Sequence, residues 1–112
     1  MNSILENNKS WIEDTWNKLN KKLLKTAVTC REIIPYTSAN GKYIDKYAPE
    51  HDCWTNGFWG GLMWLMYAAT KNEEYKKTAE KSEELMDKCF ENVETLHHDV
   101  GFMWHLLSGA NY

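Results

Sequence analysis

The chain has 112 residues, of which 43% are hydrophobic, and this is enough apolar material for the core of one domain. Its formal net charge is -3, and its lysines and arginines are interspersed with acids, so we expect no nucleic-acid partner. The longest apolar stretch, about Phe58 to Ala69, is shorter than the roughly 20 residues that cross a bilayer, and we expect no membrane span.

The N-terminus and the cysteines together predict a cytoplasmic location. The first residues lack the basic start and the apolar run of a secretory signal. Cys30, Cys53 and Cys89 are odd in number and widely spaced, unlike the pairs of a zinc or redox motif. We therefore expect three reduced, buried thiols. Six Trp and six Tyr suit either sugar binding or an aromatic core, and composition alone favours the core.

The first half of the chain divides into a helix and a loop. From about Ser10 to Glu32, apolar residues recur at three- and four-residue steps with charges between them, which predicts an amphipathic helix. The segment Ile33 to Cys53 contains both prolines and an Asn40-Gly41 pair, and it shows no helical period. We predict a long connecting loop there, of the kind that often carries function.

Three further elements follow. A helix that is apolar all round is predicted over Thr55 to Ala68, with the Thr55 hydroxyl as its N-cap, and it should be surrounded by protein. An amphipathic helix capped by Asn72 follows and runs to Phe90. After a short loop, Glu94 to Asp99, the mostly apolar segment Gly101 to Tyr112 is predicted as another buried helix.

The two apolar helices begin alike, which indicates an internal repeat. One begins Asn-Gly-Phe-Trp at residues 56–59, and the other begins Val-Gly-Phe-Met-Trp at residues 100–104. The separation of Gly57 and Gly101 is typical of helical-hairpin repeats of about 40 to 47 residues. Such repeats bury their inner helices against neighbouring copies. The pattern therefore predicts an all-α fold made of helical hairpins, with the shape of an incomplete ring.

The residues just before the last apolar helix could carry chemistry. Asp99 follows two histidines and precedes Phe102 and Trp104. Apolar surroundings favour the protonated form of a carboxylic acid, which acid catalysis requires. The alternative is that Asp99 only caps the helix and interacts with its dipole.

A metal site is a further interpretation of the same segment. Imidazoles and a carboxylate from His97, His98, Asp99 and His105 could together bind zinc. The chain contains no HExxH pattern, however, and adjacent histidines at a helix start are more often hydrogen-bonded structural groups. We expect no metal.

Two motifs in combination resemble a known family. WTNGFWGGLMWLMY, from Trp54, and HHDVGFMWHLLSGANY, from His97, are similar to the opening of glycoside hydrolase family 88, the unsaturated glucuronyl hydrolases. The related family 105, the unsaturated rhamnogalacturonyl hydrolases, is similar in fold and chemistry, and HHDVGF favours family 88. The resemblance covers about Ile33 to Tyr112. It implies that residues 1–112 are the N-terminal fragment of a single α/α-barrel domain with six helical hairpins.

The resemblance also implies an activity. Members of the family act on the unsaturated uronic acid that polysaccharide lyases leave at the non-reducing end of an oligosaccharide. An acid delivers a proton to the C4=C5 vinyl ether, water adds at C5, and the resulting hemiketal opens and releases the remaining sugar chain. No metal or organic cofactor takes part. The implied partner is therefore an unsaturated oligosaccharide substrate.

Residue by residue, the resemblance implies four site positions. Asp99 matches the family's essential aspartate in the HD-G-F motif, and His98 matches the neighbouring histidine at the substrate. Trp54 and Asn56 match the WTNGF motif, where sugar stacking and hydrogen bonding are expected. The family's second essential aspartate, taken to be the general acid and base, lies on a later inner helix that this chain does not include. Asp52 is the candidate replacement, but it lacks a comparable apolar setting.

The sequence therefore leaves open whether the chain alone is an enzyme. Our first hypothesis is a portion of such a hydrolase with little or no activity. The alternative is a non-catalytic helical domain that binds carbohydrate or protein and self-associates through exposed apolar helices. A third hypothesis is that copies of the chain complete the barrel by pairing in a homo-oligomer.

Overall fold

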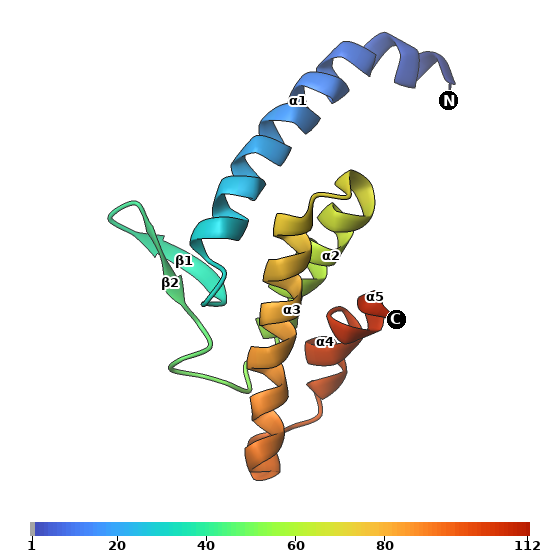
Figure 1. The fold of residues 1–112 in the computed structure, drawn as a ribbon. Helices are drawn as coiled ribbons and strands as arrows, with labels where there is room; N and C mark the ends of the chain where they lie inside the picture. The colour runs from blue at the N-terminus through green and yellow to red at the C-terminus, as the bar shows by residue number, and fades with distance from the viewer. Residues whose placement is uncertain (1) are drawn as a thin grey trace.

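The computed structural model describes residues 2–112 and is mostly helical (Figure 1). The predicted all-α class is confirmed, with one small antiparallel hairpin added among the described residues. In chain order the elements are helix α1 (Asn2–Thr29), strands β1 (Pro35–Ala39) and β2 (Lys42–Asp45), helices α2 (Asn56–Thr70) and α3 (Glu73–Asp87), the 3-10 helix η1 (Lys88–Thr95), and helices α4 (Val100–His105) and α5 (Ser108–Asn111).

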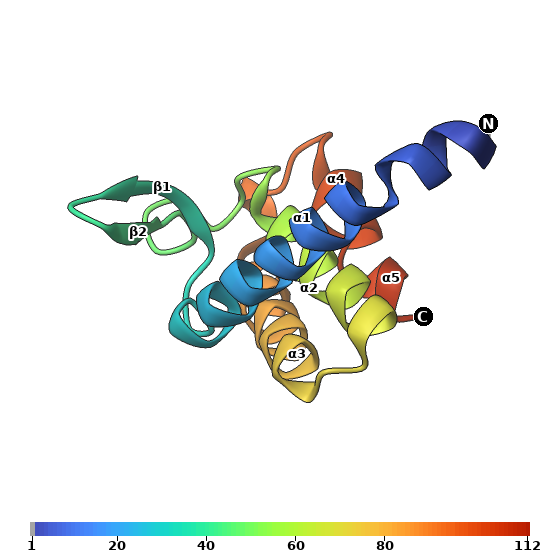
Figure 2. The same ribbon diagram turned by 90° about the horizontal axis from the view of Figure 1, so that it is seen from above.

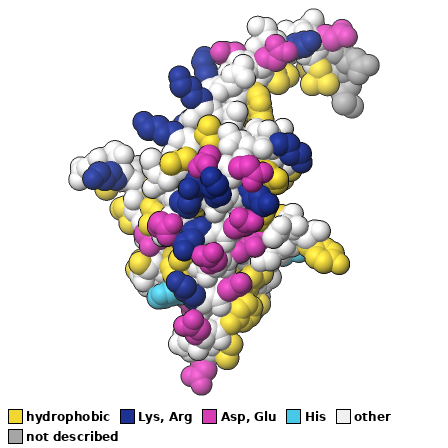
Figure 3. Space-filling view, in the orientation of Figure 1, with side chains coloured by type: hydrophobic (Ala, Val, Ile, Leu, Met, Phe, Trp, Pro, Cys, Tyr) yellow, Lys and Arg dark blue, Asp and Glu magenta, His cyan; other side chains and the backbone are white. Residues whose placement is uncertain are grey.

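Helices α2 and α3 form the central hairpin, as the sequence predicts. Lys71 ends α2 in a left-handed conformation, with a φ of 57°. The Asn72 side chain then accepts a hydrogen bond from the Glu74 amide at 3.0 Å, so the predicted cap of α3 is confirmed. Lysines and acids intermix on the outer face of the molecule in Figure 3, which agrees with the charged face predicted for α3.

The core lies where α1, α4 and the segment after α4 close on this hairpin. Its largest fully buried side chains include Tyr75, Met63, Met86, Met103 and Leu107. The C-terminal half of α1 packs against α3 through buried polar contacts as well as apolar ones. The Tyr75 hydroxyl lies 2.9 Å from the carbonyl oxygen of Asn20 and 2.6 Å from its side-chain oxygen, and the Thr78 hydroxyl donates to the Ala27 carbonyl at 2.8 Å.

Helix α1 is longer than predicted and only partly covered. It begins at Asn2, whereas the apolar period places its start near Ser10. Its N-terminal half extends away from the other helices (Figures 1 and 2). As a result Trp11 is 67% exposed and Trp16 is 39% exposed, although both belong to the apolar stripe of the predicted helix.

The segment predicted as an irregular loop contains a β-hairpin. Asn40 and Gly41 both have positive φ, 52° and 73°, and they form the two-residue turn between Ala39 and Lys42. Asn-Gly favours such turns because both residues tolerate left-handed backbone conformations. Both strands are largely exposed, so their side chains do not show the apolar alternation that marks a half-buried strand.

The C-terminal part of the chain is divided into more and shorter helices than predicted. Helix α3 ends at Asp87 rather than Phe90, and part of the predicted loop 94–99 belongs to η1. The predicted C-terminal helix is divided into α4 and α5 at Leu107, whose backbone has non-helical angles. Leu107 is itself fully buried, so packing against the core offers a reason for the break.

The exposure of α2 also differs from expectation. Phe58 is 43% exposed, Leu62 is 38% exposed and Leu65 is 67% exposed, so this apolar helix is covered on one side only. The three cysteines are free and buried, as predicted. Among the helices of residues 2–112, none is both long and apolar enough to cross a membrane.

Candidate functional site

Two segments that are far apart in the sequence meet at the start of α4. The Nε2 atom of His97 lies 2.8 Å from the carbonyl oxygen of Asp52, which belongs to the loop before α2. Beside this contact, the Trp54 and Phe102 rings pack edge to face with centroids 5.8 Å apart. The structure therefore brings the Trp54 motif and the Asp99 motif together.

The Asp99 carboxylate is not used as a helix cap. Asp99 occupies the N-cap position of α4, but its side chain makes no capping hydrogen bond, so the capping interpretation is wrong for the side chain. A carboxylate oxygen lies 3.5 Å from His98 Nε2 and 3.9 Å from His97 Nδ1. The side chain is 32% exposed. It is therefore partly sheltered and still open to a ligand.

His97, His98 and Asp99 also meet the distance requirement for a shared metal ion. Their potential ligand atoms lie within 4.8 Å of one another. The two ring nitrogens of His97 are already occupied, one at the Asp52 carbonyl and the other, 3.2 Å away, by the Asp99 amide. A metal would have to compete with one of these hydrogen bonds. The expected absence of a metal stays a prediction.

Trp54 presents an aromatic surface next to this group. Its side chain is 46% exposed, and its ring packs edge to face against Phe58 at 5.9 Å as well as against Phe102. The two neighbouring rings restrict the indole, which lowers the conformational entropy that it would lose on binding a flat ligand. The arrangement suits stacking against one face of a sugar ring.

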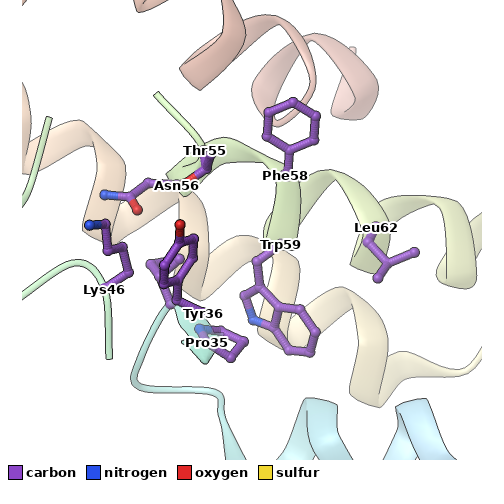
Figure 4. Close-up of a pocket in the computed structure, with 9 residues that line it drawn as sticks. Pro35, Tyr36, Lys46, Thr55, Asn56, Phe58, Trp59 and Leu62 are labelled. Atoms are coloured by element: carbon purple, nitrogen blue, oxygen red, sulfur yellow. The ribbon is translucent and has the colours of Figure 1, made fainter. Parts of the chain in front are cut away.

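Asn56 lies elsewhere. It is fully buried, and its side-chain nitrogen donates to the carbonyls of Glu50 at 2.9 Å and His51 at 3.2 Å. It lines a separate cleft of about 250 Å³, in which Figure 4 shows Tyr36 and Lys46 facing Asn56 and Trp59 while Phe58 points the other way. Direct contact between Asn56 and a sugar stays a prediction. The two hydrogen bonds of Asn56 hold the loop that leads to Trp54.

This cleft contains two buried polar atoms that bond to none of the described residues. They are Asn56 Oδ1 and Trp59 Nε1. The ammonium group of Lys46, another lining residue, is already paired with the Glu50 carboxylate, which raises the pKa of Lys46 mainly through their hydrogen bond. Within residues 2–112, Lys46 is the one charged side chain that lines the cleft, and the aromatic residues Tyr36, Phe58 and Trp59 line it as well.

The hydrogen bonds that order the loop were not predicted. Cys89, at the start of η1, donates from Sγ to the His51 carbonyl at 3.1 Å, and burial raises the pKa of its thiol. The Thr55 hydroxyl makes no cap for α2 and lies 3.2 Å from Cys53 Sγ instead, so the predicted Thr55 side-chain cap is wrong. No local pattern signals the contact between Cys89 and His51, because these residues are 38 positions apart in the chain. The cap was predicted because Thr55 stands directly before an apolar helix.

A second, apolar groove runs along the exposed side of α2. It encloses about 610 Å³ between α2 and the α4–α5 segment, and Phe58 and Leu62 separate it from the cleft of Asn56. The residues that line it are mostly apolar: Phe58, Gly61, Leu62, Leu65, His105, Leu106, Gly109 and Ala110. An exposed surface of this kind favours association with another apolar surface.

Comparisons with characterised proteins identify relatives of most of the chain. An unsaturated glucuronyl hydrolase of Bacillus sp. (strain GL1) is 40% identical over 84 residues, which is 70% of this chain and 21% of the relative. An unsaturated chondroitin disaccharide hydrolase of Streptococcus pneumoniae is 40% identical over 60 residues, or 53% of this chain and 15% of the relative. A protein of the same name from Streptococcus agalactiae is 33% identical over 60 residues.

Two other comparisons found nothing. No protein-family profile matches the chain, and no solved structure matches it. The matched part of the chain spans about a fifth of the length of the Bacillus relative, so its own fold represents only part of such a protein. The resemblance that the two motifs carry is nevertheless confirmed: over most of its length this chain is related in sequence to the unsaturated glucuronyl hydrolase family.

Proposed function

We propose that this chain is part of an unsaturated glucuronyl hydrolase that releases a 4,5-unsaturated uronic acid from lyase-generated oligosaccharides. The observation that carries the proposal is the Asp99 carboxylate, which makes no helix cap, has His98 at 3.5 Å, and belongs to the segment whose Phe102 packs against Trp54. The names of the relatives, unsaturated glucuronyl hydrolase and unsaturated chondroitin disaccharide hydrolase, support this substrate class.

In this proposal Asp99 and His98 contact the unsaturated sugar, and Trp54 stacks against it. The reaction adds a proton to the C4=C5 double bond and water at C5, after which the hemiketal opens. His98 is well placed to reach a ligand because its side chain is 90% exposed. Asn56 orders the loop before Trp54, and its Oδ1, which bonds to none of the described residues, is the polar atom that we propose for contact with the substrate.

We further propose that the chain alone has little or no activity. Proton transfer to carbon needs a group within hydrogen-bond reach of the reacting atom. Among the described residues, no second carboxylate joins the group of ligand atoms formed by His97, His98 and Asp99. Asp52 contacts this group through its backbone carbonyl rather than its side chain. The missing general acid would be supplied by a later part of a six-hairpin barrel in a cytoplasmic enzyme of family 88.

A second candidate function rests on the exposed apolar surfaces. The groove along α2 and the uncovered stripe of α1, which includes Trp11 and Trp16, would favour self-association or the binding of another protein. In this alternative the chain is a non-catalytic helical binding domain. Pairing of copies in a homo-oligomer would cover the groove.

The absorbance of the C4=C5 bond gives a direct assay for the first proposal. The purified chain is incubated with an unsaturated glucuronyl disaccharide, next to an Asp99→Asn variant that keeps the size of the side chain. We expect a slow absorbance loss or none, and any loss should vanish in Asp99→Asn. Rapid turnover that needs Asp99 would contradict the incomplete site. Turnover that survives Asp99→Asn would overturn the assignment of Asp99.

A further inference from the structure

We propose that His97 is a positioning residue, whose ring donates from Nε2 and accepts at Nδ1 and so fastens the loop before Trp54 to the backbone of Asp99. This inference rests on the proposed function, in which Trp54 and Asp99 face the same sugar. It assigns His97 to neither proton transfer nor metal binding. Its two hydrogen bonds join segments that are separated by 45 positions in the sequence.

The two neighbours of the ring indicate which of its nitrogens carries the proton. The Asp99 backbone amide can only donate, and it lies 3.2 Å from Nδ1, so Nδ1 must present a lone pair. The Asp52 carbonyl can only accept, and it lies 2.8 Å from Nε2, so Nε2 must carry a proton. Of the two neutral tautomers, only the Nε2–H form satisfies both contacts.

The loop that His97 holds is fastened at three consecutive carbonyls. Asn56 donates to the Glu50 and His51 carbonyls, Cys89 donates to the His51 carbonyl, and His97 donates to the Asp52 carbonyl. These side chains come from α2, from η1 and from the segment before α4. Of the three, His97 is the side chain that also bonds to the backbone of Asp99 among residues 2–112.

In this arrangement the backbone of Asp99 holds the residue in place, and its carboxylate is available for chemistry. The backbone amide of Asp99 is held by the His97 ring, so the position of the residue does not depend on its carboxylate. The carboxylate makes no helix cap and has His98 at 3.5 Å as a neighbour. The side chain can therefore meet a ligand without first giving up a bond that the fold needs. Loss of either His97 bond should let Trp54 and Asp99 move independently.

Two conservative substitutions of His97 each remove one of its two hydrogen bonds and keep the other. In His97→Asn the shorter amide reaches the place of Nδ1, so it can accept from the Asp99 amide but cannot reach Asp52. In His97→Gln the longer amide reaches the place of Nε2, so it can donate to Asp52 but leaves the Asp99 amide without an acceptor. His105→Gln, on the exposed side of α4, is a matched control for the loss of an imidazole.

Amide hydrogen exchange and backbone chemical shifts of the 112-residue chain supply the readout. We expect exchange at the Asp99 amide to rise roughly fivefold in His97→Gln and to stay within twofold in His97→Asn and His105→Gln. We expect the shifts of Asp52 to Trp54 to move in His97→Asn more than in His97→Gln. If both variants disturb both segments equally, or neither, the positioning role is overturned.

The tautomer and the metal alternative are tested on the unsubstituted chain. Long-range proton–nitrogen correlation spectra at neutral pH should show His97 protonated at Nε2 and unprotonated at Nδ1. A proton on Nδ1, or stoichiometric zinc that shifts both His97 and His98, would overturn the proposal. None of these measurements uses a substrate. A negative result in these measurements would therefore not contradict the proposed sugar site at Asp99. A failure to bind sugar would likewise not contradict the two His97 hydrogen bonds.

Discussion

Gly57 in α2 lies against the backbone of Met103 in α4. A β-carbon added to Gly57 would stand 2.0 Å from the Met103 carbonyl oxygen, and one added to Gly61 would stand 2.4 Å from the Leu106 carbonyl oxygen. The absence of side chains at these positions lets α4 approach α2 closely. This contact holds the segment after Asp99 against the central hairpin, and it connects the packing of the fold to the position of the candidate site.

Gly57→Ala and Gly101→Ala form a matched pair at equivalent positions of the sequence repeat. The added methyl at Gly57 must displace backbone, so we expect a loss of about 1–3 kcal/mol in the free energy of unfolding. Around Gly101 nothing lies within 4 Å of the added carbon, so the alanine should be neutral or should stabilise by up to about 1 kcal/mol. Urea unfolding followed by circular dichroism measures both. Equal losses in the two variants would contradict the close approach of α4 to α2.

Tyr75→Phe tests how α1 is attached to α3. The Tyr75 hydroxyl bonds to Asn20 of α1 while the ring is fully buried. Its removal should lower the free energy of unfolding by about 1 kcal/mol, because the Asn20 oxygens lose a partner in a partly buried place. Tyr36→Phe is the control, since Tyr36 is 58% exposed, and it should change stability by less than about 0.5 kcal/mol. A larger loss for Tyr36→Phe than for Tyr75→Phe would contradict the packing of α1.

Glu83 should make the stability of the chain depend on pH. Burial raises the pKa of its carboxyl group, an effect that the hydrogen bonds from Trp64 at 3.0 Å and Asn111 at 3.3 Å only partly offset. The folded state therefore binds the proton more tightly than the unfolded state does. The stabilisation from the neutral acid is present at low pH and is lost as the pH rises through the raised pKa.

Replacing Glu83 with Gln removes this dependence and keeps an acceptor for the Trp64 indole. We expect Glu83→Gln to melt a few degrees above the parent chain at pH 7 and to lie close to it at pH 4. Glu84→Gln serves as the control, because Glu84 is an exposed acid on the same helix. A melting temperature of Glu83→Gln below that of the parent at pH 7 would show that the ionised carboxylate stabilises the fold instead.

The apolar groove along α2 predicts self-association. Leu65 is 67% exposed and lines the groove, so Leu65→Lys should move the chain toward monomer in sedimentation velocity at a given concentration. Val93→Lys adds the same charge at a site that is 60% exposed on η1, outside the groove, and it should leave the distribution unchanged. A parent chain that is monomeric throughout the accessible concentration range would contradict self-association through the groove.

Much of the helical framework follows from local sequence. The period of α3 and the Asn72 cap depend on neighbouring residues, and both were predictable because amphipathic helices and caps use fixed local spacings. The hairpin at Asn40-Gly41 was missed although its turn has a local signal, because its exposed strands show no apolar alternation.

The candidate site was predictable only in part. The Asp99 and Trp54 motifs identified the family, and the structure brings them together. The contact from His97 to Asp52 depends on tertiary packing between distant segments, and no spacing rule predicts it. The side-chain cap predicted for Thr55 failed for a different, local reason: its hydroxyl lies 3.2 Å from Cys53 Sγ, two residues earlier in the chain.

The central claim is that an unsaturated sugar binds between Trp54 and Asp99. The most direct measurement is a nuclear magnetic resonance titration of the chain with an unsaturated glucuronyl disaccharide and with its saturated counterpart. We predict shifts at the Trp54 indole, His98, Asp99 and Phe102 that are larger with the unsaturated sugar. Trp54→Ala should weaken binding by about tenfold, and Trp11→Ala should leave it unchanged. Shifts confined to the cleft of Tyr36 and Lys46, or equal affinity of Trp54→Ala and the parent chain, would contradict the claim.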